Sequence, residues 1–467
     1  MTRSPGFGLV ASVLAGLAVL AMPAPAGLAA EGQRVLAVIV LAIGLWGLEA
    51  LPPGVTGMVA IVALVVTRAV PGVREALAGF AEPIAYFLIG VLTLGLAVER
   101  SGLADRAAQH LIELSGGQVR PLYAHLLIGF PLLTLLLPSA TTRTGILVHV
   151  YDRALSLSQV AKRAPLARAI MLALNSVNRL ASTVLLTGGI TPVVAAGLIG
   201  AVSWTRWLVL MSIPYGALLT GAALAIFLRY RRGLRGALPI VPQAERRPLS
   251  AAEIRTSIIV AGAALLWLTD AVHHWHPVLP ALLAWICLLA PRIGVLSWRD
   301  FEQGVGWANF FVIAASLSIA QALAQTGASA WLAGHVVGVA RTVGESPLLV
   351  VGVLIAASAV VRLLIPNIVG FLATTIPVAM AVGTTTGLNP IVCGLVVTIA
   401  GDAVLYYPAQ SASSLVVYER GHLTAGEIFR FGLLMTALAA VVLLVVALPY
   451  WTLVGEPLRV GGSPRAR

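Results

Sequence analysis

Charged residues are scarce in this chain: they make up 10% of its 467 residues, whereas 59% of the residues are hydrophobic. A soluble domain of this length carries far more charge on its surface. Long apolar runs recur from one end to the other, and they do not alternate as the strands of a membrane barrel would. The sequence therefore predicts an all-α polytopic membrane protein with about 10–11 transmembrane helices.

Cysteine is also scarce, and Cys287 and Cys393 both lie in apolar segments, so no disulfide framework is expected. The motifs His-Glu-x-x-His and Gly-x-x-x-x-Gly-Lys-Ser/Thr are both missing. Their absence argues against a membrane-embedded metalloprotease and an ATP-driven pump. A channel is an alternative that the sequence does not exclude. The net charge of +12 favours anchoring of cytoplasmic loops to the membrane over nucleic-acid binding.

Polar breaks divide the chain into two similar halves. Residues 1–34 are predicted to form an N-terminal span, with a signal-like segment as the alternative. The connection 229–255 carries seven arginines and is predicted to be cytoplasmic. The remaining divisions are a first repeat at 35–228 with a hairpin near 121–157, a second repeat at 256–455 with a hairpin near 348–382, and a tail at 456–467.

A polar stretch from Leu137 to Gly145, opened by Pro138, separates two apolar segments at 122–136 and 146–157. Each segment is too short to cross a bilayer, which takes about 20 residues. The pattern is typical of a re-entrant hairpin whose tip lines a cavity, although a polar surface loop is an alternative. Pro366-Asn367-Ile368 lies between two apolar arms in the second half and predicts a second hairpin.

Each half also contains an interrupted helix. The stretches Thr187–Pro192 and Tyr406–Ser414 combine glycine, proline and hydroxyl residues inside apolar surroundings. The halves share the same order: a span, a glycine turn at Gly102 or Gly327, a short helix, a hairpin and a broken helix. This order predicts two inverted repeats, in which freed amides and helix ends bind ions and substrate at mid-membrane depth.

Several of these motifs resemble the divalent anion/sodium symporter family, which carries dicarboxylates, citrate or sulfate. The residues concerned are Ser139-Ala140-Thr141, the stretch Thr187–Gly197, Pro408–Ser411 and Tyr418–Leu423, and the similarity spans roughly residues 35–450. The resemblance implies a secondary active transporter of small divalent anions that works by alternating access and is not an enzyme. It further implies a homodimer that spans the lipid bilayer of the inner cell membrane.

In that family the hairpin tips hold sodium and touch the substrate, which implies sodium ions near Ser139, Thr141 and Asn367 and no other cofactor. Here Ala140 and Ile368 stand where the family has oxygen-bearing side chains. Hard cations prefer oxygen ligands, so proton coupling or anion exchange without sodium is an alternative.

Hydroxyl, amide and guanidinium groups at these breaks suit a small anion, particularly beside half-helix N-termini. The candidate substrate contacts are Ser139, Thr141, Thr142, Arg143, Thr187, Gly188, Thr191, Asn367, Gln410 and Ser411. Arg143 is the strongest of them, because a guanidinium binds a carboxylate bidentately; its alternative is an arginine that snorkels to the surface. Arg362 also lies in an apolar segment. Arg179 and Asp402 are expected to form an ion pair, with proton transport by Asp402 as the alternative.

Overall fold

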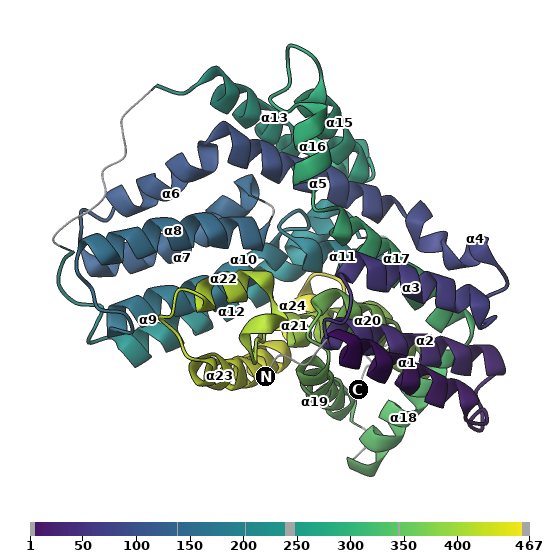
Figure 1. The fold of residues 1–467 in the computed structure, drawn as a ribbon. Helices are drawn as coiled ribbons and strands as arrows, with labels where there is room; N and C mark the ends of the chain where they lie inside the picture. Colours follow the sequence, from purple (N-terminus) through teal and green to yellow (C-terminus); the bar gives the residue numbers. More distant parts are fainter. Residues whose placement is uncertain (1–4, 138, 201, 239–247, 344–345, 460–467) are drawn as a thin grey trace, which may run out of the picture.

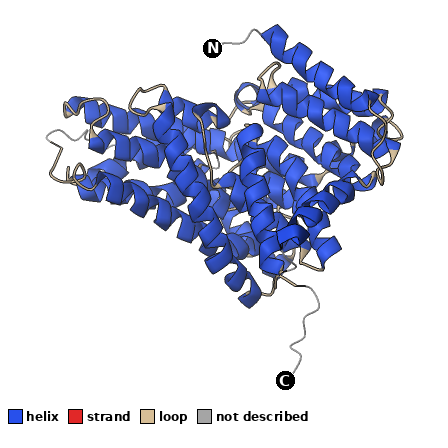
Figure 2. Cartoon of the chain, turned by 90° about the horizontal axis from the view of Figure 1, so that it is seen from below, coloured by secondary structure: helices blue, strands red, loops and turns tan. Residues whose placement is uncertain are grey.

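A computed structural model of the chain describes residues 5–137, 139–200, 202–238, 248–343 and 346–459. Within these ranges the regular structure is entirely helical (Figure 1; Figure 2). Nine of the described helices are long and apolar enough to cross a membrane, and five further apolar helices are shorter. The all-α, multi-pass membrane fold predicted from the sequence is confirmed.

The helices of the first half are α1 Pro5–Ala21, α2 Ala30–Gly47, α3 Pro53–Val66, α4 Val73–Ala76, α5 Pro83–Ser101, α6 Leu103–Glu113, α7 Val119–Leu136, α8 Ala140–Leu157, α9 Pro165–Leu172, α10 Asn178–Val184, α11 Ile190–Ile199 and α12 Trp204–Tyr230. Those of the second half are α13 Ala251–Leu268, α14 Asp270–His273, α15 Val278–Leu289, α16 Trp298–Gly304, α17 Trp307–Gln325, α18 Ala328–Val343, α19 Pro347–Leu364, α20 Ile368–Thr386, α21 Pro390–Asp402, α22 Ala412–Tyr418, α23 Ala425–Val441 and α24 Leu448–Leu453. A π-helical turn, Ala173–Val177, joins α9 to α10, and another, Val442–Ala447, joins α23 to α24.

The two halves repeat one order of elements. A long helix, α5 or α17, is followed within two residues by a glycine with left-handed backbone, Gly102 at φ 83° or Gly327 at φ 73°. Glycine adopts this conformation without steric penalty, which explains both turns. A shorter helix, a pair of long helices and a broken helix follow in each half. The inverted orientation of the two repeats stays a prediction.

Some of the segment boundaries predicted from the sequence do not coincide with helix ends. The boundary after residue 34 falls inside α2, and α1 packs closely against that helix, since a Cβ on Gly44 would meet Ser12 Oγ at 2.7 Å. The basic connection joins α12 to α13, and its Arg246 and Arg247 lie outside the described residues.

Both arms of the first hairpin are longer than the apolar segments at 122–136 and 146–157 that predicted them. Helices α7, α8 and α19 contain 18 residues each and α20 contains 19. The expectation that each flank of the first hairpin is too short to span is wrong for α7, which has the length and composition of a span. Helices α19 and α20 of the second hairpin also have the length and composition of spans. Helix α8 is longer because it takes in polar residues of the tip, with Thr141, Thr142 and Arg143 in its first turn. Helix α7 is longer at its other end, where it begins at Val119. Pro138, between the first two arms, lies outside the described residues.

Each broken helix contacts both hairpins. In the first half α10 packs against α7 and α8, whereas α11 packs against α20. In the second half α21 packs against α19 and α20, whereas α22 packs against α8. This crossed packing brings the two tips and the two breaks to one place in the interior.

Candidate functional site

A cavity of about 980 Å³ lies where the hairpin tips meet the helix breaks. Its size is in the range of sites for small molecules, which span about 300–1,000 Å³. Seven of the ten candidate contacts line it: Ser139, Thr141, Thr142, Thr191, Asn367, Gln410 and Ser411. Arg143, Thr187 and Gly188 do not. The polar breaks therefore form one part of the cavity wall, and residues of α2, α3, α5 and α17 and of the turns beside them form much of the rest.

Both hairpin tips end in an N-cap that faces this cavity. Ser139 Oγ accepts hydrogen bonds from the backbone N–H of Thr142 at 3.2 Å and from its hydroxyl at 3.1 Å. Asn367 Oδ1 accepts from the backbone N–H groups of Val369 at 2.8 Å and Gly370 at 3.4 Å. Serine and asparagine are favoured at this position because they satisfy the first amides of a helix. Helices α8 and α20 thus present their N-termini, which carry partial positive charge, to the cavity.

Two other polar side chains of the cavity wall, Thr141 and Gln410, differ in whether they form hydrogen bonds within the protein. Thr141 is exposed to the cavity, and its hydroxyl has no hydrogen-bond partner among the described residues. Gln410 is buried, and it accepts from the Tyr406 N–H at 2.6 Å and donates to the Arg362 carbonyl at 2.8 Å. Gln410 therefore braces the second break, whereas Thr141 is available to a ligand.

Arg143 is fully buried and turned toward the protein. Its guanidinium donates to Asn178 Oδ1 at 3.1 Å, to the Asn178 carbonyl at 3.3 Å, to Ser182 Oγ and to the Leu137 carbonyl. The snorkelling alternative is wrong, because none of the side chain reaches the surface. Arg143 ties the first tip to α10 and does not line the cavity.

The first break owes its glycine to close packing. A Cβ on Gly188 would lie 2.0 Å from the Ser182 carbonyl oxygen and 2.7 Å from Thr134 Cγ2. The neighbouring Thr187 is buried, and its Oγ1 accepts from Trp204 Nε1 at 3.4 Å. These two candidates lie behind the cavity wall.

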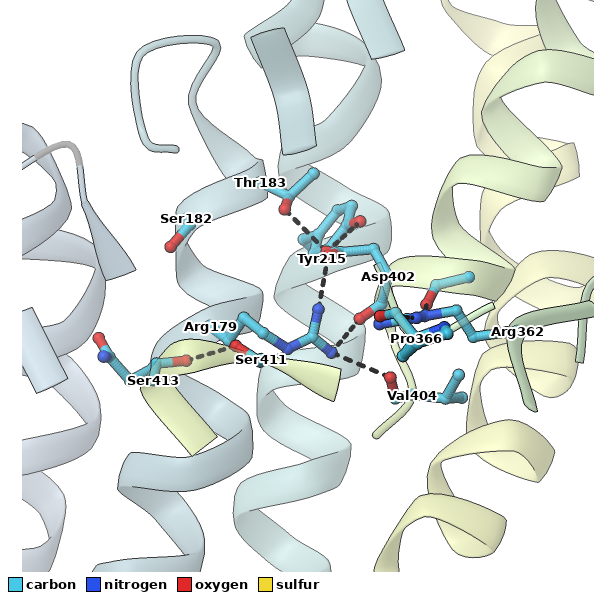
Figure 3. Close-up of polar contacts among 12 residues, drawn as sticks. Arg179, Ser182, Thr183, Tyr215, Arg362, Pro366, Asp402, Val404, Ser411 and Ser413 are labelled. Atoms are coloured by element: carbon cyan, nitrogen blue, oxygen red, sulfur yellow. Dashed lines mark hydrogen bonds and ion pairs between the residues drawn. The ribbon is translucent and has the colours of Figure 1, made fainter. Parts of the chain in front are cut away.

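The predicted pair of Arg179 and Asp402 is confirmed. Arg179 Nη1 lies 2.6 Å from Asp402 Oδ1 (Figure 3). The other carboxylate oxygen of Asp402 accepts from Thr183 at 2.7 Å and from the Tyr215 hydroxyl at 2.9 Å. Asp402 is fully buried, and Arg179 lines the cavity. This network joins α10, α12 and α21 directly behind the site.

Arg362 is a cavity residue that was absent from the predicted contacts. It is 1% exposed, at the last turn of α19, and donates through Nε to Gly401 O at 3.2 Å and through Nη1 to the Ile365 and Pro366 carbonyls. The sequence signal was an arginine four residues before the proline of the second tip.

The buried charges around the tips do not balance. Among the described residues, Asp402 pairs with Arg179, whereas neither Arg143 nor Arg362 forms an ion pair. Three buried arginines and one buried aspartate leave two positive charges uncompensated. The carboxylates that also line the cavity, Glu49 and Glu99, are exposed. An unpaired buried charge is costly, so the cavity favours an anion.

Several known proteins are similar to this chain over most of its length. A "Membrane protein" of Cupriavidus necator is 24% identical over 96% of this chain and 93% of its own length. The spinach protein "Dicarboxylate transporter 2, chloroplastic" is 24% identical over 96% of this chain and 82% of its own. An "L-tartrate/succinate antiporter" of Shigella dysenteriae is 23% identical over 93% and 96%.

A solved structure shares the fold. The crystal structure of the Alcanivorax borkumensis YdaH transporter is similar with a TM-score of 0.58 at 16% identity, over 98% of this chain and all of that one. The profile of the family described as "Sodium:sulfate symporter transmembrane region" matches residues 5–456. The match spans both hairpins and both broken helices. The chain belongs to this family of membrane transporters.

Proposed function

We propose that this protein is a secondary transporter that carries small dicarboxylates, or comparable divalent anions such as citrate or sulfate, by alternating access. The observation that carries the proposal is the pair of uncompensated positive charges at the tips that enclose the cavity. A divalent anion in the cavity offsets both charges, that of Arg362 at the wall and that of Arg143 from behind it. The N-termini of α8 and α20 and the hydroxyl of Thr141 supply donors for its oxygens.

The names of two relatives support this substrate class. One is named for dicarboxylate transport and another for tartrate and succinate, which are C4 dicarboxylates. We therefore take succinate as the first probe and sulfate as the second.

We infer further that transport proceeds by exchange and does not depend on sodium. A sodium ion at the tips would need oxygens from Ser139, Thr141 and Asn367, because Ala140 and Ile368 offer no side-chain oxygen. The oxygens of Ser139 and Asn367 already accept backbone N–H groups. The tips therefore fit sodium poorly, and transport is proposed to proceed without it.

The charge balance supplies a reason for exchange. Moving an uncompensated charge through a low-dielectric barrier costs several kcal/mol per ion. The empty carrier holds two such charges near its tips, whereas the carrier loaded with a dianion is neutral there. The carrier accordingly reorients across the membrane fast when it holds a dianion and slowly when it is empty. Entry of one dianion is therefore coupled to exit of another.

Proteoliposomes test both parts of the proposal. Labelled succinate outside should enter vesicles loaded with unlabelled succinate and enter empty vesicles far more slowly. Replacing external sodium with choline at fixed pH should leave the exchange unchanged. Uptake that rises steeply with sodium would contradict exchange without sodium, and absence of any dianion uptake would contradict the transport assignment. Placement in the inner membrane and assembly as a homodimer stay predictions.

A further inference from the structure

We propose that Arg362 binds the transported anion directly through Nη2. Nε and Nη1 of this guanidinium both donate to backbone carbonyls, of Gly401 and of Ile365 and Pro366. Nη2 has no hydrogen-bond partner among the described residues, and Arg362 lines the cavity. The residue as a whole is 1% exposed, so its unpartnered Nη2 at the cavity wall is a charged donor that an anion oxygen completes.

The buried carboxylate near Arg362, that of Asp402, is already bonded to other residues. Each oxygen of the Asp402 carboxylate is already engaged, Oδ1 by Arg179 and Oδ2 by Thr183 and Tyr215. Figure 3 shows Arg362 approaching from the opposite side of Asp402 to Arg179. Arg362 therefore keeps its charge for a ligand, whereas the charge of Arg179 is neutralised within the protein.

The two tip arginines are consequently not equivalent. Arg143 directs all three of its nitrogens at protein acceptors and does not line the cavity. Arg362 uses Nη1 to cap the end of α19 and Nε to bond the Gly401 carbonyl of α21, and it presents Nη2. The first arginine holds its tip in place, and the second both holds its tip and contacts the anion.

The capping bonds also fix the orientation of the guanidinium. A planar fork held by several carbonyls loses little freedom when it binds, so the affinity gain per bond is large. Ile368 and Val369, in the first turn of α20, line the cavity beside it. One anion oxygen at this place meets both Nη2 and the positive end of α20.

Binding measurements on purified protein test this inference, which rests on the proposed function. The variants are Arg362→Lys and Arg362→Gln, and the probe is succinate, titrated calorimetrically in detergent. Lysine still donates to the carbonyls at the end of α19 and so preserves the tip, but its single ammonium cannot also replace Nη2. We expect the dissociation constant to rise about tenfold or more for Arg362→Lys and further for Arg362→Gln.

The matched control is Arg168→Lys, on α9. Arg168 pairs with Glu427 at 3.3 Å, also has an unpartnered Nε, and does not line the cavity. Its affinity for succinate should stay within about twofold of wild type. Melting temperatures of the unliganded variants separate folding from binding: a purely structural Arg362 lowers the melting temperature and leaves the affinity of the folded protein unchanged.

The outcomes are distinguishable. Wild-type affinity in folded Arg362→Lys overturns the assignment of Arg362 and leaves the transport proposal intact. Wild-type protein that binds neither succinate nor sulfate contradicts the proposed function itself. A graded loss from wild type through lysine to glutamine, with the Arg168 control unchanged, supports the contact.

Discussion

Arg179 of α10 and Asp402 at the end of α21 join the two broken helices, with 2.6 Å between Nη1 and Oδ1. The two residues come from different halves of the chain and meet behind the cavity. The Asp402 side chain is fully buried and that of Arg179 is 10% exposed. Removal of either partner would leave a buried charge without compensation.

Asp402→Asn is therefore expected to destabilise the protein by about 3–5 kcal/mol, the usual cost of breaking a buried ion pair from one side. The measurement is chemical unfolding in detergent, followed by tryptophan fluorescence. Arg168→Gln provides the comparison, because its pair with Glu427 is partly exposed on both sides and should contribute at most about 1 kcal/mol. Equal losses of unfolding free energy in the two variants would show that the Arg179–Asp402 pair stabilises the protein no more than the partly exposed pair does.

Gly188→Ala is expected to destabilise the first break without a direct effect on ligand contacts. The added methyl group would lie 2.0 Å from the Ser182 carbonyl oxygen, which belongs to the backbone and cannot rotate away. Overpacking of this kind costs about 1–3 kcal/mol. The melting temperature should fall clearly.

The matched control is Gly216→Ala in α12, where a Cβ would meet nothing within 4 Å. Alanine is the better helix former by about 1 kcal/mol, so this variant should be neutral or slightly more stable. A fall in melting temperature at Gly216 that matches the fall at Gly188 would rule out the packing explanation.

The basic connection 229–255 is expected to face the cytoplasm. Gln118 pairs with Ala237 in an isolated bridge, so the start of α7, with Arg120, lies on the same face as this connection. Clustered basic residues resist translocation. A reporter fused at Gln243, which lies outside the described residues, should show cytoplasmic activity, and periplasmic activity would reverse the predicted orientation.

The sequence located the breaks better than the side-chain directions. Runs such as Thr187–Pro192 and Tyr406–Ser414 interrupt helices through their own residues: glycine, proline, and hydroxyls that compete for backbone hydrogen bonds. Such breaks can therefore be predicted from the sequence without knowledge of the fold. The direction of an arginine depends on its neighbours in space. Arg143 is the strongest candidate in the sequence, yet Arg362 and not Arg143 reaches the cavity, because Asn178 and Ser182 of another helix engage Arg143.

Thr141→Val is the sharpest test of the first tip. Thr141 lines the cavity, and its hydroxyl has no partner among the described residues, so the substitution removes a donor that is free to bind a ligand. Valine has nearly the same shape, so the fold should be retained, while an anion oxygen loses its partner at a cost of about 1–3 kcal/mol. This corresponds to an increase of roughly tenfold to a hundredfold in the dissociation constant for succinate. Ser156→Ala, an exposed position further along α8 that does not line the cavity, should bind like wild type. If Ser156→Ala loses affinity and Thr141→Val does not, the tip of the first hairpin is not part of the site.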